Sequence, residues 1–244
     1  MPPRVQAPQQ RSGRRNQKGE PAVPDMGDRG RRILYGVSAL GFVGLIAAVL
    51  IVALAGGGTG SAAVAKDMTS AGCSYRTVKG YVPAGQSTHV NSLTKKLPWN
   101  TSPPSNGQHY PEWAIWGFYT GPVNPRQVVH NEEHGGVVLW WGSQVSQATV
   151  GQLRAFYDEQ PIGVFGTPYP SLGSKVAITA WTGDTSRYQQ KGYYGEGHIG
   201  ICPAYNAATK KAFTSFRKAF RGHGPEGIPL CADHPGDGPN KSSC

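Results

Sequence analysis

Residues 136–157 read GVVLWWGSQVSQATVGQLRAFY, a strand pattern followed directly by a helix pattern. Gly136–Trp141 is rich in β-branched and aromatic residues and ends at a turn, as expected for a strand. Ser146 is a favourable N-cap for a helix that ends before Pro161. The apolar residues that share one face of this helix are Val150, Leu153, Phe156 and Tyr157. The stretch therefore predicts that strands and helices pack together in one domain.

The rest of residues 71–244 also contains both predicted helices and predicted strands. A second helix begins after Asn206 and ends at Gly222, with Arg217, Lys218 and Arg221 suited to its C-terminal dipole. Its inward residues are Ala212, Phe213, Phe216 and Phe220. Further strands are predicted at Val78–Val82, Gln127–His130 and Lys175–Trp181. Because the elements interleave irregularly with long Gly/Pro loops, we expect a mixed α+β domain rather than a parallel α/β fold.

An uncharged apolar segment precedes this domain. Residues 33–55 form an apolar stretch of 23 residues without Asp, Glu, Lys or Arg, and about 20 helical residues cross a bilayer. We therefore expect one N-terminal transmembrane helix. Signal-peptide cores are only about 7–15 residues long, so the 32 residues ahead of the segment favour an uncleaved signal-anchor over a cleaved signal peptide.

The charge distribution predicts the orientation of this span. The net charge of +10 includes eight basic and three acidic residues within 1–32, and Arg29, Arg31 and Arg32 lie directly before the span. By the positive-inside rule, residues 1–32 form a disordered basic cytoplasmic tail that contacts anionic lipid headgroups. Residues 56–70 read as a flexible linker, and residues 71–244 as an extracytoplasmic domain at the plasma membrane. No aromatic residues interleave with the basic ones, so nucleic-acid binding is not expected.

All four cysteines, Cys73, Cys202, Cys231 and Cys244, follow the predicted span. Outside the cytoplasm such thiols usually pair. Four cysteines allow three connectivities, and the sequence does not choose among them. Our hypothesis pairs Cys73 with Cys202 and Cys231 with Cys244. No CxxC spacing occurs, which disfavours thioredoxin-type redox chemistry.

Histidines and carboxylates concentrate in the stretch Val129–Gly136, VHNEEHGG. His130, Glu133 and His134 are ligand types that Zn²⁺ and Cu²⁺ prefer. The stretch also matches H-x-x-E-H, a protease pattern in which a helix presents both imidazoles on one face. The flanking valines and the Gly135-Gly136 pair favour strand, turn, strand instead, and protease geometry is not expected. Two alternatives stay open: the histidines fix a hairpin by hydrogen bonding its carbonyls, or they sense pH.

A second polar stretch, residues 101–111, contains adjacent prolines and Asn106-Gly107, which predict a stiff loop. Such a loop can hold His109 in a fixed position, with His89 in a neighbouring polar segment. Thioether ligation is not expected because only Met68 lies beyond the span. The aromatic residues Trp113, Trp116, Phe118 and Tyr119 are either core or a sugar-stacking surface. The candidate ligands for Zn or Cu(II) are His89, His109, His130, Glu133 and His134.

The sequence resembles the domain of unknown function 3105 family (DUF3105) of bacterial, often actinobacterial, single-pass membrane proteins. The resemblance rests on PPSNGQHY at Pro103–Tyr110, on Gly117 and Tyr119, and on VHNEEHGGVV at Val129–Val138. It covers roughly residues 75–220 and implies that His109, His130, Glu133 and His134 form one site. In that family the loop commonly reads PPTSGPH, and a Leu commonly stands where this chain has Glu132. Glu132 therefore adds a charge beside the expected site.

No nucleophile elbow, phosphate-binding glycine loop or dinucleotide fingerprint occurs in the chain. We expect a membrane-anchored extracytoplasmic protein with a His/Glu site for a divalent metal, in a binding or accessory role with an envelope protein partner. One alternative is a metal-dependent hydrolase of an envelope substrate with Glu133 as general base. Another is a structural or partner-binding module without metal.

Overall fold

The computed structural model describes residues 59–188 and 190–230. Its helices and strands, in chain order, are α2 (Thr59–Ser70), β1 (Ser74–Lys79), α3 (Pro125–Glu133), β2 (Val137–Trp141), α4 (Gln147–Glu159), β3 (Val164–Pro168), β4 (Val176–Thr182), β5 (Glu196–Cys202) and α5 (Ala207–Phe220). Short 3-10 turns lie at Pro170–Leu172 and Thr185–Arg187.

The strands form one five-stranded sheet in the order β1-β5-β4-β2-β3. Neighbouring strands are antiparallel except β2 and β3, which are parallel and are connected through α4. A parallel pair needs such a crossover, whereas antiparallel neighbours do not. The mixed α+β class predicted from the sequence is confirmed.

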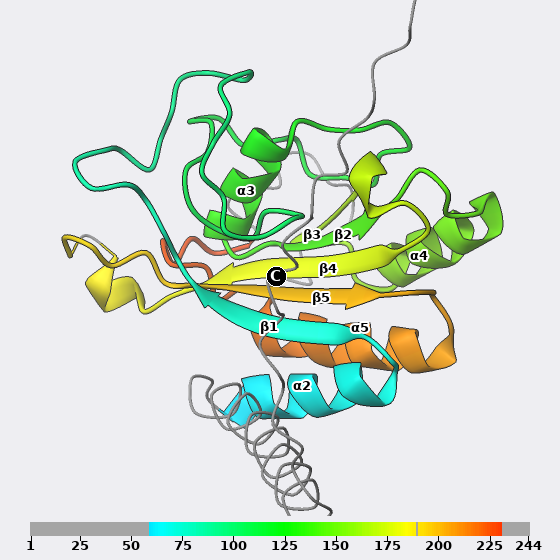
Figure 1. The fold of residues 1–244 in the computed structure, drawn as a ribbon. Coiled ribbons are helices and arrows are strands. Elements are labelled where there is room, and N and C mark those ends of the chain that lie inside the picture. The colour runs from blue at the N-terminus through cyan, green and yellow to red at the C-terminus, as the bar shows by residue number, and fades with distance from the viewer. Residues whose placement is uncertain (1–58, 189, 231–244) are drawn as a thin grey trace, which may run out of the picture. The chain divides into compact units, whose positions relative to one another are not determined.

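Alternate residues of the sheet face two separate apolar clusters, because successive side chains of a strand point to opposite faces. Val137, Leu139 and Trp141 of β2 pack with apolar residues of α2, α4 and α5. Val138 and Trp140 lie in the other cluster, with Val128 of α3 and with Trp116. Figure 1 shows α2 and α5 on one side of the sheet and α3, with the long loop between β1 and α3, on the other.

The two helices predicted from their caps are confirmed. The Ser146 hydroxyl accepts from the Thr149 N–H at 3.2 Å at the start of α4. The Asn206 side chain accepts from two backbone N–H groups at the start of α5, and the four predicted inward residues of α5 are buried. The predicted strands at 136–141 and 175–181 correspond to β2 and β4.

Three local predictions were wrong. Gln127–His130 lies in α3 rather than in a strand, and the strand predicted at Val78–Val82 lies earlier, as β1. Part of the expected linker 56–70 is the helix α2, in which Val64 and Met68 are buried in the cluster shared with α5. Their spacing of four residues places both side chains on one helical face. Strands β3 and β5 had not been predicted.

The disulfide hypothesis is confirmed for Cys73 and Cys202, which join the beginning of β1 to the end of β5. The second hypothetical pair, Cys231 and Cys244, lies outside the described residues, as do the tail 1–32 and the span predicted at 33–55. Within residues 59–188 and 190–230, no helix has the length and apolar character needed to cross a membrane.

Candidate functional site

The H-x-x-E-H pattern lies on helix α3 and at its end. The Asn124 side chain accepts from the Arg126 N–H, and Pro125 occupies the first turn, so that the helix begins there. His130 and Glu133 belong to the helix, and His134 is its C-cap residue. The expectation of strand, turn, strand was wrong for this segment. The helical spacing brings the Nε2 atoms of His130 and His134 to 3.0 Å.

The helix ends sharply at Gly135, which adopts φ +90°. A Cβ at this position would meet the backbone of Gly222 and Gly224 at 3.0–3.1 Å. The Gly222 N–H also donates to the Gly135 carbonyl at 2.8 Å. The segment that follows α5 is thereby held against the end of α3, next to His134.

His89 and His109 come from the long loop between β1 and α3, where they form an isolated bridge. The His109 N–H donates to the Thr88 carbonyl at 3.0 Å, and the Val90 N–H donates to the His109 carbonyl at 2.7 Å. The loop that contains His109 is largely buried, and His109 itself has no exposed surface. The side chain of His109 is therefore held in place by the packing around it.

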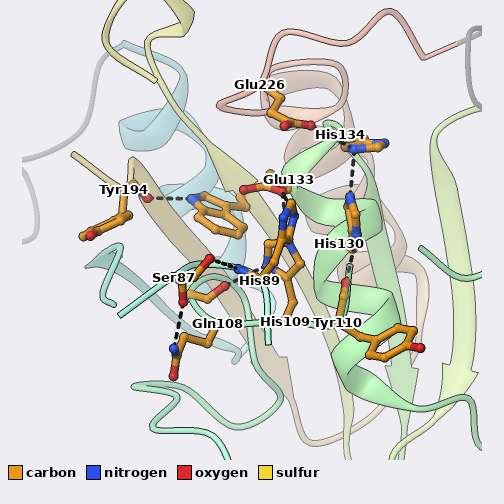
Figure 2. Close-up of polar contacts among 12 residues, drawn as sticks. Ser87, His89, Gln108, His109, Tyr110, His130, Glu133, His134, Tyr194 and Glu226 are labelled. Atoms are coloured by element: carbon orange, nitrogen blue, oxygen red, sulfur yellow. Dashed lines mark hydrogen bonds and ion pairs between the residues drawn. The ribbon is translucent and has the colours of Figure 1, made fainter. Parts of the chain in front are cut away.

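Four side chains converge in one cluster, which we call the primary cluster: His89, His109, His130 and Glu133. Their candidate ligand atoms all lie within 4.8 Å of one another, and Figure 2 shows His109 and Glu133 beside His89 and His130. Glu133 Oε2 is 3.0 Å from His109 Nε2 and 3.7 Å from His89 Nε2. Tetrahedral ligands about 2.0–2.1 Å from zinc stand roughly 3.3 Å apart, so these distances match a metal site closely.

Backbone carbonyls orient the two buried imidazoles. His109 Nδ1 is 2.8 Å from the Gly107 carbonyl, and His130 Nδ1 is 2.9 Å from the Tyr110 carbonyl. A carbonyl only accepts, so we assign the ring proton to Nδ1 in both residues, which leaves the Nε2 lone pair directed into the cluster. This arrangement is common for metal-binding histidines.

The contact between His109 and Glu133 has no hydrogen-bond donor in the tautomer assigned to His109. His109 Nε2 and Glu133 Oε2 are buried without a hydrogen-bond partner among the described residues, although they lie only 3.0 Å apart. With the His109 proton on Nδ1, both atoms are acceptors. A buried acceptor without a donor costs about 1–3 kcal/mol. A bound cation would satisfy both atoms at once.

The charge states of His130 and Glu133 suit metal binding, whereas His89 must first lose a proton. Burial, with the neighbouring His109 and His134, lowers the pKa of His130 to about 4, so its imidazole is neutral at pH 7. Burial alone would raise the pKa of Glu133, but an imidazole of His109 or His89 that directs a proton at it lowers this pKa below its ordinary value, and a bound cation would act in the same direction. The contact with Glu133 in turn raises the pKa of His89 above its ordinary value.

A second cluster overlaps the first and consists of His130, Glu133, His134 and Glu226. His134 Nε2 lies 2.9 Å from Glu226 Oε2. The Tyr188 hydroxyl contacts both carboxylates, at 2.8 Å from Glu226 Oε1 and 3.3 Å from Glu133 Oε1. Glu226 and Tyr188 had not been identified from the sequence, because each is an isolated residue in a connecting segment, far along the chain from the histidine motif.

The clusters can be reached from solvent. The side chain of His89 is 41% exposed. A cavity of about 270 Å³ reaches Glu133 and is also lined by Thr88, Trp181, Tyr188 and Lys191. The partly exposed side chain of Trp113 also lies beside the clusters. Its ring centroid is 5.0 Å from that of His134 and 5.5 Å from that of His130.

Most of the aromatic residues at 113–119 belong to the core. Trp116 is buried in the apolar cluster beneath α3. Phe118 stacks on Trp141, and Tyr119 stacks on Phe165. Trp113 remains 41% exposed, and its neighbour Ile115 81% exposed.

Glu132 does not add the charge expected beside the site. Its side chain is fully buried, and neither carboxylate oxygen has a hydrogen-bond partner among the described residues. Burial raises its pKa well above the ordinary value; the nearby Thr179 hydroxyl, which accepts from the Trp140 indole N–H, acts in the opposite direction without forming a hydrogen bond to Glu132. Glu132 is therefore a neutral carboxylic acid on the sheet side of α3.

The structure thus defines an α+β domain with a buried His/Glu cluster on one face of its sheet. Residues 89–191 match the sequence model of the family described as "Protein of unknown function (DUF3105)". The expected resemblance to this family is confirmed over those residues, which include all five predicted ligands and Tyr188 but not Glu226. No curated protein and no solved structure matches the chain.

Proposed function

We propose that this chain binds a divalent transition metal ion, Zn²⁺ or Cu²⁺, through His89, His109, His130 and Glu133. The observation that carries the proposal is the pair of buried acceptors, His109 Nε2 and Glu133 Oε2, that face each other at 3.0 Å. Three imidazoles and one carboxylate form a ligand set typical of zinc and Cu(II). Met68 is buried in the apolar cluster of α2 and α5, which disfavours a thioether site for Cu(I).

In our proposal the metal domain is extracytoplasmic and is anchored in the plasma membrane by residues 33–55, with a binding or accessory role in the envelope. The apolar segment and the basic residues before it support this placement. The Cys73–Cys202 disulfide supports an oxidising compartment. Contacts of the tail with anionic lipids, and an envelope protein partner, stay predictions from the sequence.

The test is metal analysis of the full chain, purified in detergent without a histidine tag, stripped with chelator and dialysed against Zn²⁺ or Cu²⁺. We expect at least one equivalent of ion to stay bound. The His109→Ala variant should bind that ion at least about 10-fold more weakly, because it loses a directly bound nitrogen. His223→Ala is the matched control, since it removes an exposed imidazole outside both clusters. A wild-type chain that retains no ion, or a His109→Ala variant with unchanged affinity, contradicts the proposal.

A metal-dependent hydrolase of an envelope substrate is the second candidate. The observation that favours it is access: the cavity beside Glu133 and the exposed edge of His89 leave a path for substrate and water. Since Glu133 faces His109 as a ligand would, it is better placed to hold the ion than to act as the general base. Release of soluble fragments from isolated cell envelopes, measured with metal-loaded wild-type and His109→Ala chains, tests this activity. Equal release by both chains contradicts it.

A further inference from the structure

We propose that the site holds two divalent metal ions, the second bound by His134 and Glu226, with Glu133 bridging the pair. This inference rests on the proposed function, since it adds an ion beside the first one. The second cluster provides four candidate ligand atoms within 4.8 Å of one another, from His130, Glu133, His134 and Glu226. Figure 2 shows His134 between His130 and Glu226, above the primary cluster.

The contacts of His134 supply the first argument. Its Nε2 lies 3.0 Å from His130 Nε2 and 2.9 Å from Glu226 Oε2. His130 Nε2 is a lone-pair atom, because the Nδ1 proton is directed at the Tyr110 carbonyl. A single proton on His134 Nε2 cannot lie along both contacts. A cation between the three atoms would satisfy the imidazole lone pairs and the carboxylate together, at separations close to those of zinc ligands.

The two oxygens of Glu133 supply the second argument. Oε2 faces His109 and His89, whereas Oε1 lies on the side of Tyr188 and Glu226. The carboxylate therefore presents one oxygen to each cluster. A bridging carboxylate is the arrangement expected when two ions sit about 3.5–4 Å apart. Glu226 adds a second negative charge to that of the shared Glu133 carboxylate, which offsets part of the charge of the second ion.

The ligand count leaves room for water or substrate. His130 has one free nitrogen and binds one ion at a time: with a single ion it completes the primary cluster, and with two ions it binds the second, which leaves His89, His109 and Glu133 for the first. The second ion then has His130, His134, Glu226 and the other oxygen of Glu133. Tyr188 donates to the outer oxygen of Glu226 at 2.8 Å and positions that carboxylate as an outer-shell partner does. The first ion therefore has three protein ligands and an open coordination position next to the cavity.

The experiment uses Cu²⁺ as the probe on the full chain in detergent, with stoichiometry by elemental analysis and magnetic coupling by electron paramagnetic resonance. We expect two equivalents in the wild-type chain and a spin-coupled spectrum, because two Cu²⁺ ions about 4 Å apart interact. Glu226→Gln should bind one equivalent and show an uncoupled Cu²⁺ signal. Tyr188→Phe should keep two sites, with the second weakened about 10- to 100-fold.

Glu112→Gln is the matched control, because Glu112 is an exposed carboxylate outside both clusters. Circular dichroism and the urea unfolding midpoint establish that each variant is folded, and Glu226→Gln preserves the shape of a side chain that is 21% exposed. One equivalent in the wild-type chain, unchanged in Glu226→Gln and lost in His109→Ala, overturns the second ion and leaves the proposed function standing. No bound ion in the wild-type chain overturns both.

Discussion

Replacing Glu132 by Leu should stabilise this protein, although most substitutions of buried residues destabilise. Glu132 is fully buried on α3, and both of its oxygens lack a hydrogen-bond partner among the described residues. Val128, one turn earlier on the same helix, lies in the apolar cluster with Trp116 and Trp140. The carboxyl group therefore sits where an apolar side chain would pack well.

Two opposing contributions determine how much Glu132→Leu should raise the free energy of unfolding. Removing an unpaired buried polar group recovers about 1–3 kcal/mol. A change of side-chain shape in a packed core costs up to about 1.5 kcal/mol. The net effect is a stabilisation of about 1–2 kcal/mol, or a rise in melting temperature of roughly 2–8 °C for a domain of this size.

The stabilisation produced by Glu132→Leu should also increase with pH. Burial raises the pKa of Glu132 well above the ordinary 4.5. The folded state therefore holds a proton that the unfolded state releases above about pH 4.5. The wild-type chain loses stability as the pH rises from there toward the folded-state pKa, whereas the Leu variant has no such loss. The advantage of Leu should be larger at pH 8 than at pH 5.

The assay is urea unfolding followed by tryptophan fluorescence, with chelator present so that metal binding does not contribute. Glu132→Gln is the matched control: it removes the titration but leaves an unpaired amide, so it should flatten the pH dependence with a smaller gain. An unfolding midpoint for Glu132→Leu at or below that of the wild type at pH 8 would show that the buried carboxyl group does not destabilise the fold.

Three further predictions concern other parts of the fold. Burial lowers the pKa of His198 to about 4, so its neutral form stabilises the fold above pH 6.5 and this contribution is lost as the pH falls toward 4. Between pH 7.5 and pH 5 the free energy of unfolding, measured in urea, should therefore fall by about 2 kcal/mol more for the wild type than for His198→Gln. An equal fall in both proteins would contradict the lowered pKa of His198. Removing the disulfide with Cys73→Ala and Cys202→Ala should cost up to about 5 kcal/mol, because the bond closes a sequence separation of 129 residues; a calorimetric midpoint that does not move would count against this. A Cβ at Gly224 would lie 2.2 Å from the Glu133 carbonyl oxygen, so Gly224→Ala should destabilise the fold and displace Glu226, lowering Cu²⁺ stoichiometry more than an alanine at the unobstructed Gly151 would. Equal Cu²⁺ stoichiometry in these two glycine variants would contradict that role for Gly224.

The parts of the fold that the sequence predicts well are those with local signals. Ser146 and Asn206 cap α4 and α5, and the apolar spacing behind each cap matches one helical face. Helix α3 also has its signals, Asn124 followed by Pro125. These helix signals compete with Val128 and Val129, which favour strands by propensity but are fully buried residues of α3 here. Tertiary packing decided the conformation of these two residues.

The candidate site was predictable only in part, for a related reason. Its histidines belong to two dense polar motifs, and the structure brings His89, His109, His130 and Glu133 into one cluster. His134 turns toward Glu226 instead. Glu226 reaches the site because the segment after α5 returns to the end of α3 through the contact between Gly222 and Gly135. A return of this kind depends on the folded topology, and no local spacing in the sequence encodes it.

The Cys73–Cys202 bond also determines how a pulling force would travel through the domain. A force applied ahead of Thr59 first loads α2 and then meets the cross-link at the beginning of β1. There it divides between β1, at the edge of the sheet, and its neighbour β5, ahead of the loop that carries His89 and His109. The bond therefore divides such a force between two strands, so that β1 alone does not bear it.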